Sequence, residues 1–317
     1  MSMDDMSRDL LEKNKAVALR FKKSQGTKDM PAVEREVLAP NYDRARGGSF
    51  HLAANARDPS WAHPGMYLRT SLPDRVDVIE GIVAEGERVG LLFRINATHT
   101  GAYFGVEPTN RKLDVYECAF LRVVNGQMVE GWFMMDEAGK LQQLGAKLPP
   151  RADGKRIAPA LPQGGEDPAT MLERLAAQQT DSSEHRNKLA VLGALSAGAA
   201  DDSSRTYGRV TRRLLQHLHE RATRNGAGDQ ALRSAIPDLK TRVEVLIAEG
   251  EEVWARCNFE GTHTNALYGI APTGKRVGFS GMLIARFAGV EWKERWEFGD
   301  ELGLLLQIGE PDLLLEA

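Results

Sequence analysis

The order of hydrophobic and polar residues predicts a helical start followed by strands in each half of the chain. Apolar residues recur at helical spacing over residues 10–22 and again over residues 210–222, which predicts a helix at each place. After the first of these, four stretches read as β-strands separated by turn residues: 76–86, 89–100, 112–124 and 127–135. Helices followed by consecutive strands favour an α+β fold, in which the helices cover one face of a curved antiparallel sheet.

The chain contains this pattern twice. A shift of 164 positions aligns residues 73–145 with residues 237–309 without a gap, and 24 of the 73 aligned pairs are identical. Two copies of this length predict two domains of one fold, over residues 1–148 and 169–317. Residues 149–168 hold five prolines and three glycines, so we interpret them as an extended linker between the domains.

Composition narrows the functional class. The formal charge is −3 with 27% charged residues, which is not the basic footprint of a nucleic-acid-binding protein. No apolar run is long enough for a membrane span, and the first 15 residues lack the apolar core of a signal peptide. Cys118 and Cys257 are too few for a disulfide framework or a zinc-type cluster. We therefore expect a cytoplasmic protein that binds neither nucleic acid nor a membrane and that has no zinc-type cysteine cluster.

The last strand of each copy carries the candidate chemistry. Because side chains alternate across a strand, every second residue shares a face, and one face of the first copy holds Glu130, Trp132, Met134 and Asp136. The same face of the second copy holds Glu294, Trp296, Phe298 and Asp300, whereas the opposite face differs between the copies. Unpaired carboxylates are costly to bury in a core, so two acids beside a tryptophan favour a pocket wall.

A hairpin turn extends this argument to the neighbouring strand. The dipeptide Asn125-Gly126 predicts a two-residue turn between the third and fourth strands. In the register that follows, Glu117 lies opposite Met134 and diagonal to Asp136, about 7–8 Å away on the same face. Two carboxylates that close can differ in pKa, which leaves one as a protonated donor and the other as an ionised base. The second copy has Gly281 in place of Glu117, so we expect the first domain to be the active one.

Each candidate also has a structural interpretation. Asp136 and Asp300 precede predicted short helices, where aspartate is a favoured N-cap. His99 and His263 each lie between two threonines, where a histidine either bonds a turn or serves as a general base or as a donor to a substrate carbonyl. The tryptophans of the last strands fit a core as well as a ligand platform, and the glutamates could pair with cations at the sheet rim. His51 is a further, weaker candidate for substrate binding.

Three motifs recur in both copies and carry a family resemblance. In the second copy they lie in GTHTNALYGIAPTGKRVGFSG, residues 261–281, and in ERWEFGDELGLLLQIG, residues 294–309. In the first copy they lie at residues 98–101, 105–109 and 132–145. This combination resembles the SnoaL-like polyketide cyclases, often labelled ester cyclases, whose pattern is similar to G-T-H-T-G, G-x-x-P-T-G-K and W-x-x-x-D-x-x-G-L-x-x-Q-L-G. The chain departs from it at Asn110-Arg111 and at Asn265.

The resemblance implies two tandem cone-shaped α+β barrels of the nuclear-transport-factor-2-like type. Such domains commonly pair through their sheets, which implies an intrachain pseudo-dimer and allows a homo-oligomer. The resemblance also implies catalysis without cofactor or metal, with an aspartate as acid and base in an intramolecular aldol-type ring closure. By position, that role falls on Asp136 and Asp300.

The leading hypothesis is a cofactor-independent cyclase, isomerase or lyase that acts on a hydrophobic, carbonyl-bearing small molecule. Its predicted catalytic residues are Asp136, His99, Glu117, Asp300 and His263. Its predicted substrate-binding residues are Trp132, Met134, Glu130, His51, Trp296, Phe298 and Glu294. Two alternatives are a non-catalytic small-molecule binding protein and an epoxide-hydrolase-like enzyme on the same fold.

Overall fold

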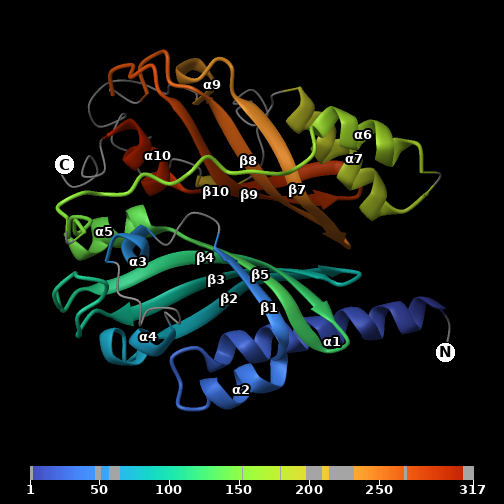
Figure 1. Ribbon diagram of the computed structural model, residues 1–317. Helices are drawn as coiled ribbons and strands as arrows, with labels where there is room; N and C mark the ends of the chain where they lie inside the picture. The colour runs from blue at the N-terminus through green and yellow to red at the C-terminus, as the bar shows by residue number, and fades with distance from the viewer. Residues whose placement is uncertain are drawn as a thin grey trace. The chain divides into compact units, whose positions relative to one another are not determined.

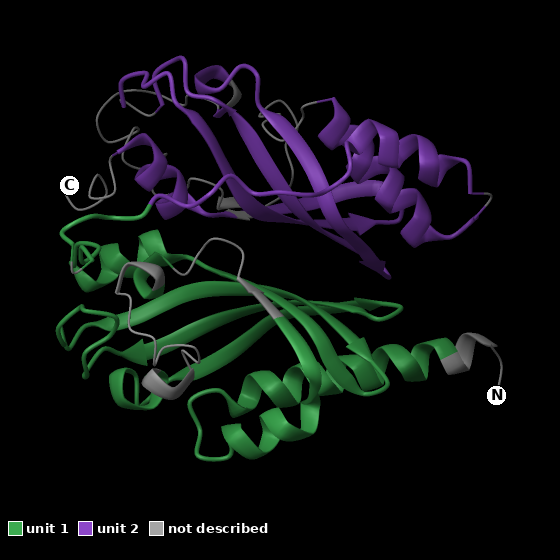
Figure 2. Ribbon diagram, in the orientation of Figure 1, with its two compact units in different colours: residues 1–157 green, residues 158–317 purple. Residues whose placement is uncertain are grey.

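The computed structural model describes residues 3–46, 51–56, 65–151, 153–178, 180–197, 209–213, 232–267 and 270–309. It divides the chain into two compact units, Met1–Ile157 and Ala158–Ala317 (Figure 2). The division falls within the Pro- and Gly-rich segment. Residues of that segment also join the second sheet, because Glu166 pairs with Val243 through two backbone hydrogen bonds.

Unit 1 is a five-stranded sheet whose first two helices lie side by side against one face (Figure 1). Its strands run in the order β1-β5-β4-β3-β2, with β1 parallel to β5 and the other pairs antiparallel. The predicted helix and the four predicted strands are present, whereas β1 was not predicted. The elements are α1 Met3–Ser24, α2 Met30–Val37, β1 Leu38–Arg46, α3 His51–Ala56, α4 Gly65–Ser71, β2 Val76–Glu85, β3 Arg88–Thr98, β4 Lys112–Val124, β5 Gln127–Met135 and α5 Glu137–Leu144.

The core of unit 1 lies between α1, α2 and the sheet face that they pack against, which we call the helix-covered face (Figure 1). Alternate residues of β3, β4 and β5 point into it, and Phe21 of α1 contacts Phe133 of β5 at a ring-centroid distance of 6.1 Å. Full burial of an aromatic or aliphatic side chain contributes about 1.5–3 kcal/mol. This packing therefore determines which strand residues face inward.

A β-bulge after the predicted hairpin turn overturns the predicted register. Asn125 and Gly126 have φ of 50° and 78°, as a type I′ turn requires. Three residues after Gly126, however, Val129 has no partner of its own, because the paired residues step from Val123↔Met128 to Arg122↔Glu130. Glu117 consequently pairs with Met135, and the prediction that it faces Met134 is wrong. A shift of one residue moves a side chain to the opposite face, so Glu117 points toward α1.

Unit 2 repeats this frame in the order β6-β10-β9-β8-β7. The same bulge recurs at Lys293, which aligns with Val129 of unit 1. A helix was predicted over residues 210–222. The prediction is wrong for residues 210–213, which belong to the strand β6, and residues 214–222 lie outside the described part of the structure. The elements are α6 Pro168–Ala176, α7 Ser183–Ser196, β6 Arg209–Arg213, α9 Leu232–Ala235, β7 Lys240–Glu249, β8 Glu252–Thr262, β9 Arg276–Ala288, β10 Glu291–Gly299 and α10 Glu301–Ile308.

Candidate functional site

Four charged side chains meet on the helix-covered face of unit 1. The Lys22 ammonium, from the last turn of α1, lies 3.0 Å from Asp77 Oδ2 and 3.5 Å from Glu117 Oε2. The Arg75 guanidinium donates to both oxygens of Asp77 at 2.7 and 3.0 Å, and lies 3.8 Å from Glu117 Oε2. All four side chains are at most 8% exposed. We call Lys22, Arg75, Asp77 and Glu117 the charge quartet; its formal charges cancel.

Burial and mutual attraction act in opposite directions within the charge quartet. Burial lowers the pKa of Lys22, and the neighbouring Arg75 charge adds to this, while Glu117 and Asp77 oppose it. Burial alone would raise the pKa of Asp77, yet Lys22 and Arg75 hold it below its ordinary value. The Lys22 ammonium also lies 3.5 Å from the centroid of the Phe93 ring. Glu117 Oε1, by contrast, accepts no hydrogen bond from the described residues.

A second polar group adjoins the charge quartet. The Lys140 ammonium lies 3.1 Å from the Tyr103 hydroxyl and 4.6 Å from the centroid of that ring. It also contacts the sulfur of Met135, the residue that pairs with Glu117 across the strands. The ring of His99 meets Tyr103 edge-on at 6.3 Å. We call His99, Tyr103 and Lys140 the donor group.

His99 has a defined tautomer and one unused nitrogen. Its Nδ1 accepts from the Thr109 backbone at 3.3 Å, so the network assigns the ring proton to Nε2. The side chain is fully buried, and Nε2 has no hydrogen-bond partner among the described residues. Burial lowers the pKa of His99, and the positive charge of Lys140 lowers it further, while a smaller contribution from the Gly101 backbone opposes them. The ring is therefore neutral at pH 7 and presents an N–H donor.

The repeated Thr-His-Thr motif has a structural role in both units. In unit 2, His263 Nδ1 lies 3.1 Å from the Thr273 hydroxyl, as His99 lies 3.1 Å from that of Thr109. The threonine before each histidine bonds an aspartate through its backbone and its hydroxyl, Thr98 to Asp74 and Thr262 to Asp238. These bonds hold the loop after β3 and after β8, which explains why both copies keep the motif.

Asp136 and Asp300 are the N-caps of short helices, as one of the two interpretations of the sequence predicted. Asp136 accepts from the Gly139 backbone at 2.8 Å and caps α5, and Asp300 accepts from Gly303 at 2.9 Å and caps α10. Asp300 is buried and Asp136 is half-buried. The predicted pairing of Glu117 and Asp136 on one face is wrong, because the bulge turns Glu117 toward α1.

The remaining predicted residues do not join the charge quartet. Trp132 and Met134 are buried on the opposite, outer face of the sheet, where the Trp132 ring contacts Phe120 at 6.0 Å. Trp296 aligns with Trp132, and its Nε1 has no hydrogen-bond partner among the described residues. The Phe298 side chain lies outside the described part of the structure.

The predicted glutamates and His51 have other partners. Glu130 pairs with Arg88 at 2.8 Å and with Arg122 at 3.3 Å, on a half-exposed rim. Glu294 pairs with Arg286 at 2.8 Å in the corresponding place. His51 begins α3, where its backbone N–H donates to the buried carboxylate of Glu137 at 2.5 Å.

Unit 2 lacks the counterparts of most members of both polar groups, while His263 takes the place of His99. The aligned residues are Leu239 for Arg75, Thr241 for Asp77, Leu267 for Tyr103, Gly281 for Glu117 and Leu304 for Lys140. Unit 2 instead buries an Arg295–Glu297 ion pair on β10, where unit 1 has Gly131 and Phe133. Burial, with a smaller contribution from Glu297, raises the pKa of Cys257 to about 12, so this thiol stays protonated.

A sequence comparison within the chain could have found the missed residues. The residues that were not predicted are not identical in the two copies: Lys22, Arg75, Asp77, Tyr103 and Lys140. Most of them stand where one copy is polar and the other apolar, and that contrast is visible in the printed sequence.

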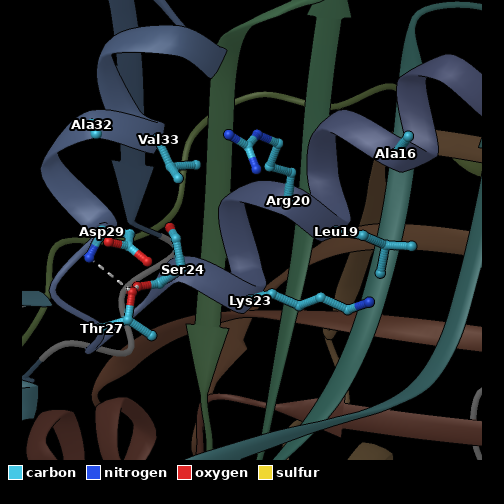
Figure 3. Close-up of a pocket in the computed structure, with 9 residues that line it drawn as sticks. All are labelled: Ala16, Leu19, Arg20, Lys23, Ser24, Thr27, Asp29, Ala32 and Val33. Atoms are coloured by element: carbon cyan, nitrogen blue, oxygen red, sulfur yellow. Dashed lines mark hydrogen bonds between the residues drawn. The ribbon is translucent and has the colours of Figure 1, made fainter.

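One open groove lies apart from these residues. It has a volume of about 700 Å³ and is lined from α1, α2 and the turn between them (Figure 3). Its lining consists of Ala16, Leu19, Arg20, Lys23, Ser24, Thr27, Asp29, Ala32 and Val33. None of these residues belongs to the charge quartet or the donor group. Elsewhere in the described part of the chain, no three His, Cys, Asp or Glu side chains are placed to share a metal ion.

The sequence pattern of the SnoaL-like polyketide cyclases matches this chain twice, at residues 66–144 and 225–308. The chain belongs to the SnoaL-like polyketide cyclase family. The predicted tandem α+β fold is thereby confirmed, with one curved sheet and its helices in each unit. Within the described residues, no helix combines the length and apolar character that a membrane crossing needs.

Some solved structures are similar to less than half of this chain. A protein assigned as a SnoaL-like polyketide cyclase, from Jannaschia sp. CCS1, is 20% identical over 44% of this chain and 96% of its own, with a TM-score of 0.37. IdmH from Streptomyces antibioticus, assigned as a polyketide cyclase, is 23% identical over 42% and 99%, with a TM-score of 0.36. AclR from Streptomyces galilaeus, assigned as a hydroxylase, is 24% identical over 43% and 97%, with a TM-score of 0.36. No curated protein matches the chain.

Proposed function

We propose that unit 1 catalyses cofactor-independent acid–base chemistry on a hydrophobic, carbonyl-bearing small molecule, as a cyclase, isomerase or lyase. One observation carries the proposal. Unit 1 buries a carboxylate with one oxygen unbonded, on Glu117, and a neutral histidine whose Nε2–H has no hydrogen-bond partner among the described residues, on His99. Lys140 connects their surroundings, because it contacts Tyr103, whose ring meets that of His99, and Met135, which pairs with Glu117. Proton removal next to a carbonyl needs such a base, and the enolate oxygen that forms needs such a donor.

The roles follow from the contacts. Lys22 and Arg75 hold Glu117 through Oε2, which orients the carboxylate and leaves Oε1 to accept a proton from the substrate carbon. His99 Nε2 and the Tyr103 hydroxyl donate to the substrate oxygen. Apolar residues of the helix-covered face, such as Phe93, exclude water and so strengthen these interactions.

Asp136 is the competing candidate for the base, because the family resemblance gives it that role. Its carboxylate already accepts the Gly139 N–H, which a cap requires whether or not catalysis occurs. Unit 2 retains the same cap at Asp300 but has glycine in place of Glu117, so we propose that unit 2 does not catalyse this chemistry.

The test is deuterium exchange from D₂O into methyl 5-oxo-5-phenylpentanoate, a ketone with exchangeable protons beside its carbonyl, followed by NMR. We expect the full chain to catalyse exchange and Glu117→Gln to slow it by about 10²–10⁴-fold. Asp136→Asn should retain the rate, because asparagine caps helices about as well as aspartate. Glu87→Gln, which alters an exposed glutamate paired with Arg122, is the matched control.

Two results would contradict the proposal. If the ketone exchanged its protons with the wild-type chain no faster than in buffer alone, the chain would lack the proposed activity. Loss of exchange in Asp136→Asn with retention in Glu117→Gln would transfer the role of base to Asp136.

A further inference from the structure

We infer that β2 of unit 1 is an interaction surface for a second copy of this chain, and that the β2 strands of two copies pair antiparallel about a two-fold axis. The surface consists of the side chains of Val76 and Val78 and of the backbone groups along the outer edge of β2. The inference is independent of the proposed function, because it uses no side chain of the charge quartet or of the donor group.

Unit 2 shows how the equivalent edge of the fold is covered. β7 is the last strand of its sheet, as β2 is in unit 1. Glu166, which precedes α6, exchanges two backbone hydrogen bonds with Val243 across that edge, at 2.8 and 2.9 Å. Gly165 lies so close to β7 that a Cβ added to it would meet the Cβ of Arg242 at 2.9 Å. The backbone groups of Val243 that point away from β8 are therefore satisfied by an extended segment.

The corresponding backbone edge of unit 1 has no such cover among the described residues. Ile79 aligns with Val243, so its N–H and C=O point away from β3. The same groups of Asp77 point that way too, because the direction of backbone groups alternates along a strand. No described residue pairs with β2 on this side. A row of exposed backbone donors and acceptors is a template for pairing with another strand.

The side chains beside this edge are apolar in unit 1 and charged in unit 2. Val76 is 58% exposed and Val78 is 37% exposed, on the sheet face opposite α1. Unit 2 has Lys240 and Arg242 in the aligned positions, both exposed. Cations on an edge strand oppose pairing with another strand, whereas valine favours it. Within its described residues, unit 1 therefore lacks both the covering segment and the charges that protect the edge of unit 2.

A second copy of β2 has the features that the occupant of this edge needs. The occupant must be extended, apolar on one face and unsatisfied along its own edge, and β2 is all three. With the two-fold axis at Val78, the two Val78 residues form a close pair, about 4.5 Å between Cα atoms, and Val76 of each copy extends the apolar stripe. Asp77 of each copy then exchanges backbone hydrogen bonds with Ile79 of the other. One self-complementary surface is what a two-fold interface requires.

The experiment is sedimentation velocity of the full chain. Pairing over a few residues buries less than the about 1,200 Å² of a standard interface, so we expect a weak dimer whose population rises with concentration up to about 500 µM. Val78→Lys should raise the dissociation constant at least about 10-fold, because it places like charges opposite each other and removes the central apolar contact. Val290→Lys, at a valine that is 85% exposed between β9 and β10, is the matched control and should leave the dimer intact.

Hydrogen exchange followed by mass spectrometry identifies the strand that pairs. We expect the backbone amides of β2 to exchange more slowly in concentrated than in dilute wild-type protein, and those of β7 to exchange at the same rate in both. Val78→Lys introduces the kind of side chain that unit 2 carries in the aligned position, so we expect its thermal melt to match that of the wild type.

Three results would overturn the inference. The first is a wild-type chain that stays monomeric up to the highest concentration. The second is a dimer that Val78→Lys leaves as stable as that of the wild type, and the third is a dimer whose formation protects strands other than β2. The two wild-type measurements need no variant, so a folding defect in Val78→Lys cannot obscure them.

Discussion

Unit 1 and unit 2 share a frame and differ in the chemistry of their interiors. Both have the Thr-His-Thr loop bonded to an aspartate, a capped helix after the last strand, and a bulge at the same aligned place. Unit 1 buries the charge quartet and the donor group, while four of the aligned residues of unit 2 are leucine or glycine, and only Thr241 and His263 are polar. The identities between copies therefore report what the fold needs, and the differences report where one copy does something that the other does not.

The largest expected effect is a loss of stability in unit 1 alone, caused by a substitution that unbalances the charge quartet. Lys22→Met leaves the buried carboxylates of Asp77 and Glu117 with Arg75 as their remaining cation. We expect the free energy of unfolding of unit 1 to fall by about 3–5 kcal/mol, the usual cost of breaking a buried ion pair. Hydrogen exchange followed by mass spectrometry should show faster exchange in β2 and β4 and none of this effect in β7 and β9.

The control for Lys22→Met is an exposed lysine on the same helix. Lys13 is 69% exposed and pairs with Asp9 one turn away, so Lys13→Met should cost less than about 0.5 kcal/mol. Equal effects of the two substitutions would mean that the charge quartet does not stabilise the folded state.

A smaller effect should be the same in both units. Asp136→Ala and Asp300→Ala each remove an N-cap, which costs about 1 kcal/mol, whereas the asparagine variants should be close to neutral. Denaturant unfolding of the four variants measures this directly. A cost for Asp136→Ala far above that for Asp300→Ala would show that Asp136 does more for the fold than cap a helix.

The smallest expected effect is a pH dependence of folding stability, which both units share. Burial lowers the pKa of His99 and of His263 below the ordinary value of 6.5. The unfolded chain then binds protons that the folded chain excludes, so stability is complete above pH 6.5 and declines as the pH falls toward the folded values. Thermal melts from pH 7.5 to 5 should show the decline, and His99→Asn should reduce it. A stability that rises with acidity over this range would contradict the assignment of neutral rings.

Local sequence predicted the turn but not the register beyond it. Asn125-Gly126 needs only its own backbone angles to form a type I′ turn, so the dipeptide is sufficient to predict it. The bulge at Val129 depends on how the whole sheet packs against α1 and α2, and no residue near Val129 signals it. Because β4 has apolar residues on both faces, including Phe120 and Leu121, its alternation does not show which face turns inward.

The sequence by itself determined the duplicated α+β fold, the family, the capped helices and the candidacy of His99 and Glu117. These features depend on repeats, motifs and residues close together in the chain. Only the tertiary structure decided that Glu117 faces α1 and meets Lys22, Arg75 and Asp77, and that Lys140 lies buried beside Tyr103. Those contacts join residues from separate elements, and a single bulge selects which side chains face inward, so packing of the complete unit is what brings them together.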